Sequence, residues 1–583
     1  MHNHYLDLIR AVWYYGEQWR TYIVSYYLIL GIAQILLSLS PYAFGKAIDA
    51  LQNLTFASKS QVIFWLLVGV GVIFLFWLFQ VPGRVIERSI ALKIQHKFRL
   101  NFYDQLINLP LKWHQEHHSG NIIARINRSS IAIYRFAENQ FDYLQNIIKF
   151  IIAISFLLWI SLPIGFISLC ASLIIMLVVI FFDGKLIPLY KKSNEIENQI
   201  EMILFDYISN ITTLLALRIE QFTRNNLFQH MMSIWEFFRK KIILNEVKWF
   251  SVGVLFSIVQ TAILIVYISY TLNTEKTVML GIVVMIFRYQ WELNDVLQDL
   301  SINYSEIVRM NIDLQSIQLI LDDFKRQEHP YNNNKISSQW RIIQIKNLIL
   351  TRNNHENSRW HIFDKMKLKI IRGEKIALIG LSGSGKSTLL NLLAGLRIPD
   401  KVDLKVDEIY FNSLEPLRSI TTLITQDPEI FANTIKFNIT FGLPIELDQI
   451  WHTIRLVELV GVINYLPKGL ETDLREKGFN LSVGQKQRLA LARGLLAARL
   501  SSLILMDEPT SSVDFPTEKK IITNIISNLP DTAIIISLHR LQLLPNFDSV
   551  IMLQNKKIVA YGSVQTLLNK RGPVHDLFVD AKI

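Results

Sequence analysis

The sequence predicts two domains of different fold class: an all-α transmembrane domain with six helices, followed by an α/β domain of the P-loop type. Two observations predict this division. Long runs without a charged residue are confined to the first half of the chain, and a phosphate-binding loop lies between a strand-like and a helix-like run in the second half. We place the transmembrane domain at residues 1–330, a linker at 331–340 and the α/β domain at 341–583.

The composition of the 583-residue chain argues against a wholly soluble protein. Hydrophobic residues make up 51% of the chain and charged residues 19%, whereas soluble domains have about 25% charged residues. The single cysteine, Cys170, excludes an intrachain disulfide framework and a multi-thiolate metal site. The formal charge of +11 would suit nucleic acid or an anionic membrane surface, but no cluster of basic and aromatic residues indicates a nucleic-acid site, so we expect no nucleic-acid partner.

Five runs without a charged residue predict the membrane helices. These runs cover residues 21–45, 60–83, 150–182, 249–274 and 277–287. A helix needs about 20 apolar residues to cross a bilayer core, so the third run supplies two helices and the fifth needs the mixed segment that follows it. Buried helices of a large soluble protein are the alternative, but such cores rarely contain five runs of this kind. The predicted helices cover about 21–45, 60–83, 142–162, 163–187, 249–272 and 277–300.

Basic residues predict the orientation in the membrane. Two cytoplasmic hairpins, at about 84–149 and 183–248, hold ten and nine Lys or Arg residues. The loops on the other side hold only Lys46, Lys59 and Lys276. By the positive-inside rule the hairpins lie in the cytoplasm. We therefore expect a multi-pass protein of the bacterial inner membrane with its α/β domain in the cytoplasm.

A phosphate-binding loop is the first functional motif in the second half of the chain. Residues 380–388 (GLSGSGKST) follow the strand-like run KIALI and precede the helix-like run LLNLLAGL, which is the context that a P-loop requires. The glycines let backbone N–H groups face phosphate oxygens, and the helix N-terminus adds its dipole. We expect Lys386 to bind the β- and γ-phosphates and Ser387 to ligate Mg²⁺. The predicted nucleotide-binding residues of this loop are Gly380, Leu381, Ser382, Gly383, Ser384, Gly385, Lys386, Ser387 and Thr388.

Two further apolar runs end in residues that suit phosphate chemistry. Leu503–Met506 ends at Asp507 and Glu508, and Ala533–Ser537 ends close to His539. Short, continuously apolar runs are typical of buried parallel strands, which deliver polar residues at their carboxyl ends. We expect Asp507 to complete the Mg²⁺ shell, Glu508 to polarise the attacking water and His539 to reach the γ-phosphate.

These motifs together resemble the ATP-binding cassette (ABC) transporter family over essentially the whole chain. The sequence around Gln426 is similar to the family's Q-loop, Asp514 in SSVD to its D-loop, and Glu476–Gly478 to a short loop that exporters place against a cytoplasmic hairpin. The resemblance implies an ABC-type ATPase fold, in which Gln426 contributes to the ATP and Mg²⁺ sites. It also implies that the signature motif contacts the ATP of a partner domain through Leu481, Ser482, Val483, Gly484 and Gln485.

The membrane half is similar to the exporter branch of the family, in which six helices are fused to one cassette. Residues 117–129 and 206–220 resemble the first and second cytoplasmic hairpins of that branch. Two positions depart from the family pattern. Val483 replaces the usual glycine of the signature, and Arg352 stands where an aromatic residue usually stacks on adenine, with Trp360 nearby. A guanidinium can also stack on a base, so we include Arg352 among the ATP-binding residues.

The resemblance implies export of an amphipathic or hydrophobic substrate, such as a drug, lipid or peptide, driven by ATP hydrolysis through alternating access. ATP and Mg²⁺ are the expected cofactors, and membrane lipid is an expected partner. One chain holds one P-loop and one signature motif, so the functional unit requires two chains. We expect a homodimer because Lys386, Asp507, Glu508 and His539 are all present; a heterodimer is the alternative. Alternative functions are export of a small ribosomal peptide, ATP-gated regulation without pumping, and uptake by an exporter-type fold.

Charged residues in the last predicted membrane helix indicate a second site of interest. Arg288, Glu292, Asp295 and Asp299 are spaced by four, three and four residues, which places them on one helical face. Charges at membrane depth either pair with one another or face a wet cavity. The spacing therefore fits an Arg288–Glu292 ion pair with acids at the cytoplasmic end, and the alternative is a stripe along the substrate path.

Overall fold

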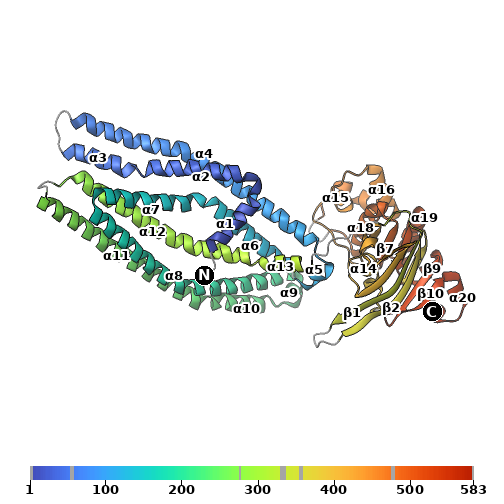
Figure 1. The fold of residues 1–583 in the computed structure, drawn as a ribbon. Coiled ribbons are helices and arrows are strands. Elements are labelled where there is room, and N and C mark those ends of the chain that lie inside the picture. The colour runs from blue at the N-terminus through green and yellow to red at the C-terminus, as the bar shows by residue number, and fades with distance from the viewer. Residues whose placement is uncertain are drawn as a thin grey trace. The chain divides into compact units, whose positions relative to one another are not determined.

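The chain folds into two compact units, which are described separately (Figure 1). The helical unit contains residues 1–109 and 113–328, and the second unit contains residues 110–112 and 329–583. The computed structural model describes residues 4–52, 58–117, 119–274, 278–327, 336–353, 359–474 and 480–580.

The helical unit consists of long helices that lie side by side (Figure 1). Within the residues that the structure describes, five helical stretches are long and apolar enough to cross a membrane by length and composition: Glu17–Gln52, Lys59–Ile107, Ile122–Ile160, Leu162–Ser209 and Glu220–Asn273. The helices are α1 (His4–Tyr15), η1 (Glu17–Trp19), α2 (Arg20–Leu37), α3 (Ser40–Gln52), α4 (Ser58–Ile107), α5 (Leu111–Glu116), α6 (Ser119–Glu138), α7 (Gln140–Ile160), α8 (Leu162–Ser209), α9 (Ile211–Leu217), α10 (Glu220–Ser233), α11 (Trp235–Thr274), α12 (Leu280–Gln315) and α13 (Gln318–Gln327).

Prolines mark two of the helix boundaries in this unit. The helix predicted over 21–45 is two helices, α2 and α3, because Pro41 in the first turn of α3 cannot donate the hydrogen bond that would continue α2. Pro163 lies in the first turn of α8 and follows Ser161, whose backbone is extended. Proline is well tolerated in a first turn because its missing N–H would be unpaired there anyway.

Two of the helices are far longer than a bilayer is thick. Helix α4 has 50 residues and α8 has 48. At about 1.5 Å per residue, each is more than 70 Å long, against a hydrocarbon core of about 30 Å. Each therefore has room to cross a membrane and to extend well beyond it. The short helix α5 follows α4, and α9 follows α8, so these turns lie at the ends of the long helices.

The second unit is an α/β domain with two sheets. The four-stranded sheet has the order β2-β1-β4-β5 and the six-stranded sheet the order β10-β9-β3-β8-β7-β6. All pairs from β9 to β6 are parallel, whereas β10 pairs with β9 antiparallel. The strands are β1 (Ile342–Asn353), β2 (Arg359–Ile371), β3 (Lys375–Ile379), β4 (Lys401–Val406), β5 (Ile409–Phe411), β6 (Thr421–Ile424), β7 (Leu503–Asp507), β8 (Ala533–Ser537), β9 (Ser549–Gln554) and β10 (Lys557–Ser563).

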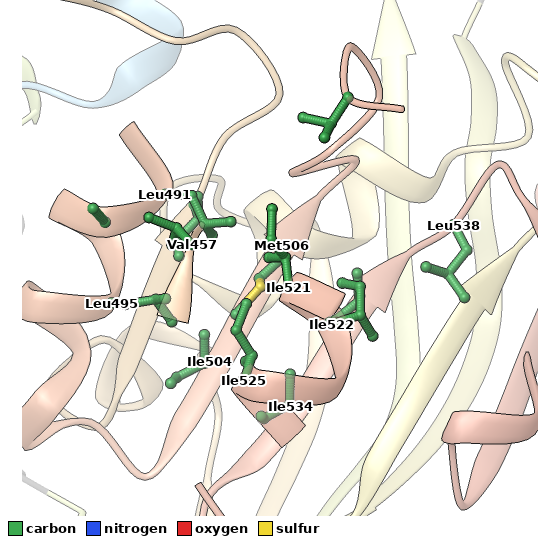
Figure 2. Packing of buried hydrophobic residues seen from close by; sticks show 14 of the residues in the cluster. Val457, Leu491, Leu495, Ile504, Met506, Ile521, Ile522, Ile525, Ile534 and Leu538 are labelled. Carbon is green, nitrogen blue, oxygen red and sulfur yellow. The ribbon is translucent and has the colours of Figure 1, made fainter. Parts of the chain in front are cut away.

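Helices cover the parallel strands, and three of these strands are completely buried. Every residue of β3, β7 and β8 is buried, which explains why these runs are continuously apolar. Figure 2 shows part of this core, with Leu491 of α18, Ile525 of α19 and Met506 of β7 packed in one cluster. The helices are α14 (Lys386–Leu393), η2 (Glu415–Ser419), α15 (Ile435–Thr440), α16 (Leu447–Leu456), α17 (Val460–Tyr465), η3 (Gly469–Glu471), α18 (Val483–Ala497), η5 (Ala498–Leu500), α19 (Phe515–Asn528), η6 (Leu541–Asn546), α20 (Val564–Asn569) and α21 (Pro573–Asp580).

Candidate functional site

The parallel strand order brings four separate sequence motifs to one edge of the sheet. Strands β3, β8, β7 and β6 are consecutive neighbours. Because they run in the same direction, their carboxyl ends meet at the same edge. The P-loop follows β3, His539 follows β8, Glu508 follows β7 and Gln426 follows β6. Strand β8 lies between β3 and β7, so the histidine comes between the phosphate-binding loop and the carboxylates.

The P-loop has a backbone shape that only glycine allows at its ends. Gly380 has φ +151°, and a Cβ atom there would lie 2.2 Å from the carbonyl oxygen of Leu553. Gly385, with φ +105°, precedes Lys386, the first residue of α14. The Lys386 Nζ donates to the Gly380 carbonyl oxygen at 2.9 Å and so crosses the loop. The buried Oγ of Ser384 has no hydrogen-bond partner among the described residues. An orphaned hydroxyl inside a loop of this shape fits a phosphate ligand.

The carboxylate of Glu508 is the point at which these motifs meet. Its Oε1 lies 2.7 Å from Nε2 of His539 and 3.7 Å from Nζ of Lys386. Its Oε2 accepts a hydrogen bond of 2.7 Å from Nε2 of Gln426. Glu508 is only 9% exposed, so these contacts are shielded from bulk water. Three side chains from three different strand ends therefore hold one carboxylate in place.

The backbone of Glu508 is strained. Its φ of +48° lies in the left-handed region, which costs a residue with a Cβ atom about 1 kcal/mol or more. A serine on the neighbouring strand supports this turn, because the Glu508 N–H donates to Oγ of Ser537 at 2.7 Å and Ser537 Oγ donates to Oδ1 of Asp507 at 2.8 Å. Ser537 thus positions both carboxylates, a role that the sequence alone did not predict.

The predicted Mg²⁺ ligands offer the donors that this ion prefers. Ser387, Gln426 and Asp507 provide hydroxyl, amide and carboxylate oxygens, and Mg²⁺ binds such oxygens together with substrate phosphates. Asp507 is 8% exposed and lies at the carboxyl end of β7, next to Glu508. The described residues contain no group of three or more His, Cys, Asp or Glu that could hold a metal by themselves. The donor set therefore fits a Mg²⁺ ion that arrives with a nucleotide.

The signature motif forms a well-capped helix start. The Ser482 side chain accepts from the N–H of Gln485 at 3.3 Å, and the Gln485 side chain accepts from the N–H of Ser482 at 2.9 Å, which is a capping box. A Cβ atom on Gly484 would lie 2.8 Å from the Ser512 carbonyl oxygen, so this position needs glycine. Val483 is 61% exposed. Its side chain therefore points out of the domain, and valine replaces glycine there without a clash in the described chain.

Gln487 connects the signature helix to the segment that follows β7. Its Nε2 donates to the Glu508 carbonyl oxygen at 3.1 Å and to Oγ of Ser511 at 3.0 Å, and its Oε1 accepts from the N–H of Ser512 at 2.9 Å. Gln487 is 4% exposed. The sequence alone predicted no role for Gln487. The sequence signal for this role was a glutamine on the apolar face of α18, because a buried amide side chain needs a hydrogen-bond partner.

Glu518 joins the loops after β7 and β8. Its Oε1 accepts from Oγ1 of Thr510 at 2.8 Å, and its Oε2 accepts from Nη1 of Arg540 at 2.6 Å. Burial raises the pKa of Glu518, although the hydrogen bond from Thr510 and the charge of Arg540 oppose this. The three residues line a cavity of about 90 Å³ together with Glu508, Ser511, Ser537 and His539. Glu518 also went unrecognised in the sequence, because its role depends on two segments far apart in the chain.

Other predicted residues lie apart from this cluster. Asp514 is the N-cap of α19, where its side chain accepts from the N–H of Thr517 at 3.1 Å, and these hydrogen bonds lower its pKa. The backbone of Arg352 pairs with Trp360 between β1 and β2, but both side chains lie outside the described parts of the structure. The predicted loop Glu476–Gly478 also lies outside the described residues. Arg288, Glu292, Asp295 and Asp299 all lie in α12 of the helical unit.

Comparison with known families matches both halves of the chain. The model of the ABC transporter transmembrane region matches residues 24–293, and that of the ABC transporter ATP-binding part matches residues 363–511. The solved structure of a bacterial Atm1-family ABC exporter with ATP bound has a TM-score of 0.83 and 20% identity, and the match covers 97% of this chain and 98% of that one. This structural match shows that the two chains share a fold.

Curated relatives agree in family but differ in extent. The multidrug resistance-like ATP-binding protein MdlB of Buchnera aphidicola is 32% identical over 294 residues, which is 50% of this chain and 49% of the relative. The mitochondrial iron-sulfur clusters transporter ATM1 of Kluyveromyces lactis is 26% identical over 497 residues, which is 82% of this chain and 67% of the relative. The match thus spans about half the length of the MdlB relatives. The two family models together match most of the chain, and the protein belongs to the ABC transporter family.

Proposed function

We propose that the protein is an ATP-hydrolysing exporter of the Atm1 and MdlB type, which moves an amphipathic or hydrophobic substrate out of the cytoplasm. The carboxylate of Glu508, held by Lys386, Gln426 and His539, carries this proposal. A structural role alone would not require a strained, buried glutamate at the tip of a strand beside a P-loop lysine. The names of the relatives, an iron-sulfur clusters transporter and a multidrug resistance-like protein, support transport and leave the substrate class open.

The chemistry follows from the roles of the residues at the sheet edge. Backbone N–H groups of the P-loop and Lys386 bind and orient the β- and γ-phosphates. A water between Glu508 and the γ-phosphate gives its proton to a carboxylate oxygen as its own oxygen attacks phosphorus. The bond from phosphorus to the bridging oxygen of ADP then breaks. His539 donates a hydrogen bond to the γ-phosphate and keeps Glu508 aligned. When bound, Mg²⁺ neutralises charge on the phosphate oxygens, and Ser387, Gln426 and Asp507 would hold it.

The functional unit that we propose is a homodimer. Each chain has one P-loop and one signature motif, and the N-terminus of α18 is exposed at Val483, so it is free to face a second cassette. Backbone N–H groups at a helix start are suited to bind phosphate. The residues Lys386, Asp507, Glu508 and His539 are all present, so two identical chains would form two complete ATP sites. A heterodimer is the alternative arrangement.

We also propose the location and the direction of transport. The basic residues of the hairpins support a cytoplasmic ATPase domain by the positive-inside rule, in the bacterial inner membrane. Binding of ATP closes the two cassettes, the cytoplasmic hairpins transmit this motion, and the membrane helices open outward. Hydrolysis then returns the dimer to the inward-open state. The long helices α4 and α8 are suited to this coupling because they reach well beyond a bilayer.

Transport in inside-out vesicles tests the proposal. The full chain, reconstituted alone, should run as a dimer by native mass measurement, hydrolyse ATP and accumulate substrate inside the vesicles only with hydrolysable ATP. A monomer without ATPase activity would exclude the homodimer. Substrate flux that needs ATP binding but no hydrolysis would identify a gated regulator instead. Accumulation in right-side-out vesicles would identify an uptake system, and stimulation by small peptides alone would identify a peptide exporter.

A further inference from the structure

A buried carboxylate in α12 lacks a partner. The Oε2 atom of Glu292 is shielded from water and makes no hydrogen bond within the described residues. Asp295 is exposed and Asp299 is half-buried, one and two turns further along the same helix. The sequence had allowed an ion pair between Arg288 and Glu292. Among the residues that the structure describes, no ion pair between Arg288 and Glu292 forms within 4.0 Å, although the charge of Arg288 acts on Glu292 over a longer distance.

Helix α7 contributes polar groups to the same place. Helices α7 and α12 pack against each other. Asn146 of α7 is 1% exposed, and its side-chain atoms make no hydrogen bond of 3.5 Å or less in the described chain, although the side chain lies near the carboxylate of Asp299. Asn146 and Lys149 lie close enough to act electrostatically on Asp299, as does Asp142. The charged residues Arg288, Glu292, Asp295 and Asp299 of α12 are therefore one half of a polar set that includes residues of α7.

The charges of this set do not balance. Three acidic residues of α12 belong to it, and two cations oppose them. The acids are Glu292, Asp295 and Asp299, and the cations are Lys149 and Arg288. Asp142 of α7 also acts on Asp299, but Arg84 and Arg88 oppose the charge of Asp142. A buried polar group without a partner destabilises the fold, and a charged one does so more strongly. A bound cation would remove this destabilisation. Its positive charge would neutralise the surplus acid and lie against the carboxylate oxygen of Glu292 that has no hydrogen-bond partner.

Aromatic side chains continue the set along the same helices. The rings of Phe156 and Tyr289 stack with their centroids 4.9 Å apart and 12° between their planes. The ring of Tyr42 lies 5.8 Å from Phe156 and 6.2 Å from Trp159, which is 68% exposed. Phe156 follows Lys149 by seven residues, or two helical turns, so both lie on one face of α7 about 10 Å apart. Carboxylates and an aromatic surface are thus adjacent.

We propose that α7 and α12 together form a binding site for amphipathic organic cations. The carboxylates of Glu292, Asp295 and Asp299 would neutralise the positive charge, and the aromatic cluster around Phe156 would bind the hydrophobic body, partly through cation–π attraction. The inference rests on the proposed transport function, because it names the substrate class of that transporter. It narrows the range from drugs, lipids and peptides to compounds that carry one or two positive charges.

Two ions of the same shape and opposite charge provide the test. Radiolabelled tetraphenylphosphonium and tetraphenylborate are dialysed to equilibrium against the full chain in neutral lipid nanodiscs. The cation should bind at least tenfold more tightly than the anion. Glu292→Gln and Asp299→Asn should each weaken cation binding about tenfold or more. Asp295→Asn should likewise weaken cation binding, and it changes an exposed position where the substitution does not endanger folding. The matched control is Glu197→Gln, an exposed carboxylate of α8 outside the set, which should leave binding and basal ATPase activity unchanged.

The outcomes separate this inference from the proposed function. Equal binding of both ions, or unchanged cation binding by the three variants, overturns the cation site even if the protein hydrolyses ATP. Tight cation binding that the variants abolish supports the site, because dialysis needs no ATP turnover. A protein that binds the cation but never hydrolyses ATP contradicts the proposed function and leaves the site standing.

Discussion

Nε2 of His539 lies 2.7 Å from Oε1 of Glu508, although 31 residues separate them in the chain. The contact exists because β8 and β7 are parallel neighbours, with Ser537 opposite Asp507 in their register. Both side chains leave the sheet at the same edge. His539 is half-exposed and Glu508 is buried, so the histidine lies on the open side of the carboxylate.

Substitution of Glu508 by glutamine should nearly abolish ATP turnover. Glutamine keeps the shape and the contacts with Gln426 and His539 but cannot accept the proton of water, and loss of a general base typically costs about 10²- to 10⁴-fold in rate. Binding of a fluorescent ATP analogue should persist. Phosphate release measures the rate. The double variant with His539→Ala should lose less than the product of the two single losses, since His539 acts in part through Glu508.

The control for this experiment is Asp448→Asn, an exposed acid of α16, which should retain wild-type turnover. Wild-type turnover by Glu508→Gln would remove this residue from the role of base. Two independent, additive losses in the double variant would show that His539 acts on the phosphate without help from Glu508.

Substitution of Glu518 by glutamine should lower kcat several-fold with little change in the KM for ATP. The variant weakens the ionic contact with Arg540 at 2.6 Å, which holds the loop of His539 against the loop of Glu508. No contact with nucleotide is lost, so ATP binding should hardly change. A KM increase without a change in kcat would instead place Glu518 in the binding of ATP.

The same variant should alter the pH dependence of stability. Burial raises the pKa of Glu518 above its ordinary value of 4.5, so its contribution to stability is fully present below that value and is lost as pH rises through the raised pKa. Glutamine does not titrate. The melting temperature of wild type minus that of Glu518→Gln should therefore fall as the pH is raised from about 4 towards neutrality. A constant difference would show that the pKa of Glu518 is not shifted by folding.

Substitution of Gln487 by alanine should destabilise the segment that follows β7. The change leaves the Ser512 N–H without its partner and removes one of two donors to the Glu508 carbonyl oxygen, which still accepts from the Ser511 N–H at 3.3 Å. An unsatisfied buried group typically costs about 1–3 kcal/mol. Hydrogen exchange of residues 508–513 and chemical unfolding of the full chain measure the effect. Gln449→Ala, which removes an exposed glutamine of α16, should cost less than about 0.5 kcal/mol. Equal effects of the two variants would refute a special role for Gln487.

Substitution of Asp183 by asparagine should destabilise the helical unit strongly. Asp183 of α8 and Lys248 of α11 form a buried ion pair at 3.0 Å, and Lys248 also donates to Oγ of Ser301 in α12 at 3.0 Å. Loss of one partner leaves a buried charge uncompensated, which typically costs about 3–5 kcal/mol. Thermal unfolding in detergent detects the loss. The double variant with Lys248→Met should recover most of it, whereas no recovery would show that Asp183 acts through other contacts.

Local sequence features predicted the parts of the protein that depend on neighbouring residues. The P-loop could be read directly because Gly380, Gly385 and Lys386 are consecutive elements of one turn. The capping box of Ser482 and Gln485 is similarly local, since both partners lie within one helical turn. The break at Pro41 was also visible in principle, yet the uncharged run masked it, because lipid tolerates proline inside a long apolar stretch.

Contacts between distant segments could not be predicted in this way. Gln487 and Glu518 look like ordinary polar helix residues until α18 and α19 are packed beside β7 and β8. The spacing of Arg288 and Glu292 suggested an ion pair. Side chains four residues apart can pair, but groups on neighbouring helices can draw each of them elsewhere. Asn146 and Lys149 of α7 belong to the same polar set and carry no sign of it in the sequence.

The sequence by itself determined the family, the succession of membrane helices and cassette, and the residues that handle phosphate, because hydrophobic runs and contiguous loop motifs are written within short stretches of chain. Tertiary structure alone decided how Glu508 is held, which residues support its loop, and which side of α12 joins α7. The physical reason is that strand order and helix packing set the distances between remote side chains, and in a buried site those distances decide which charges find a partner.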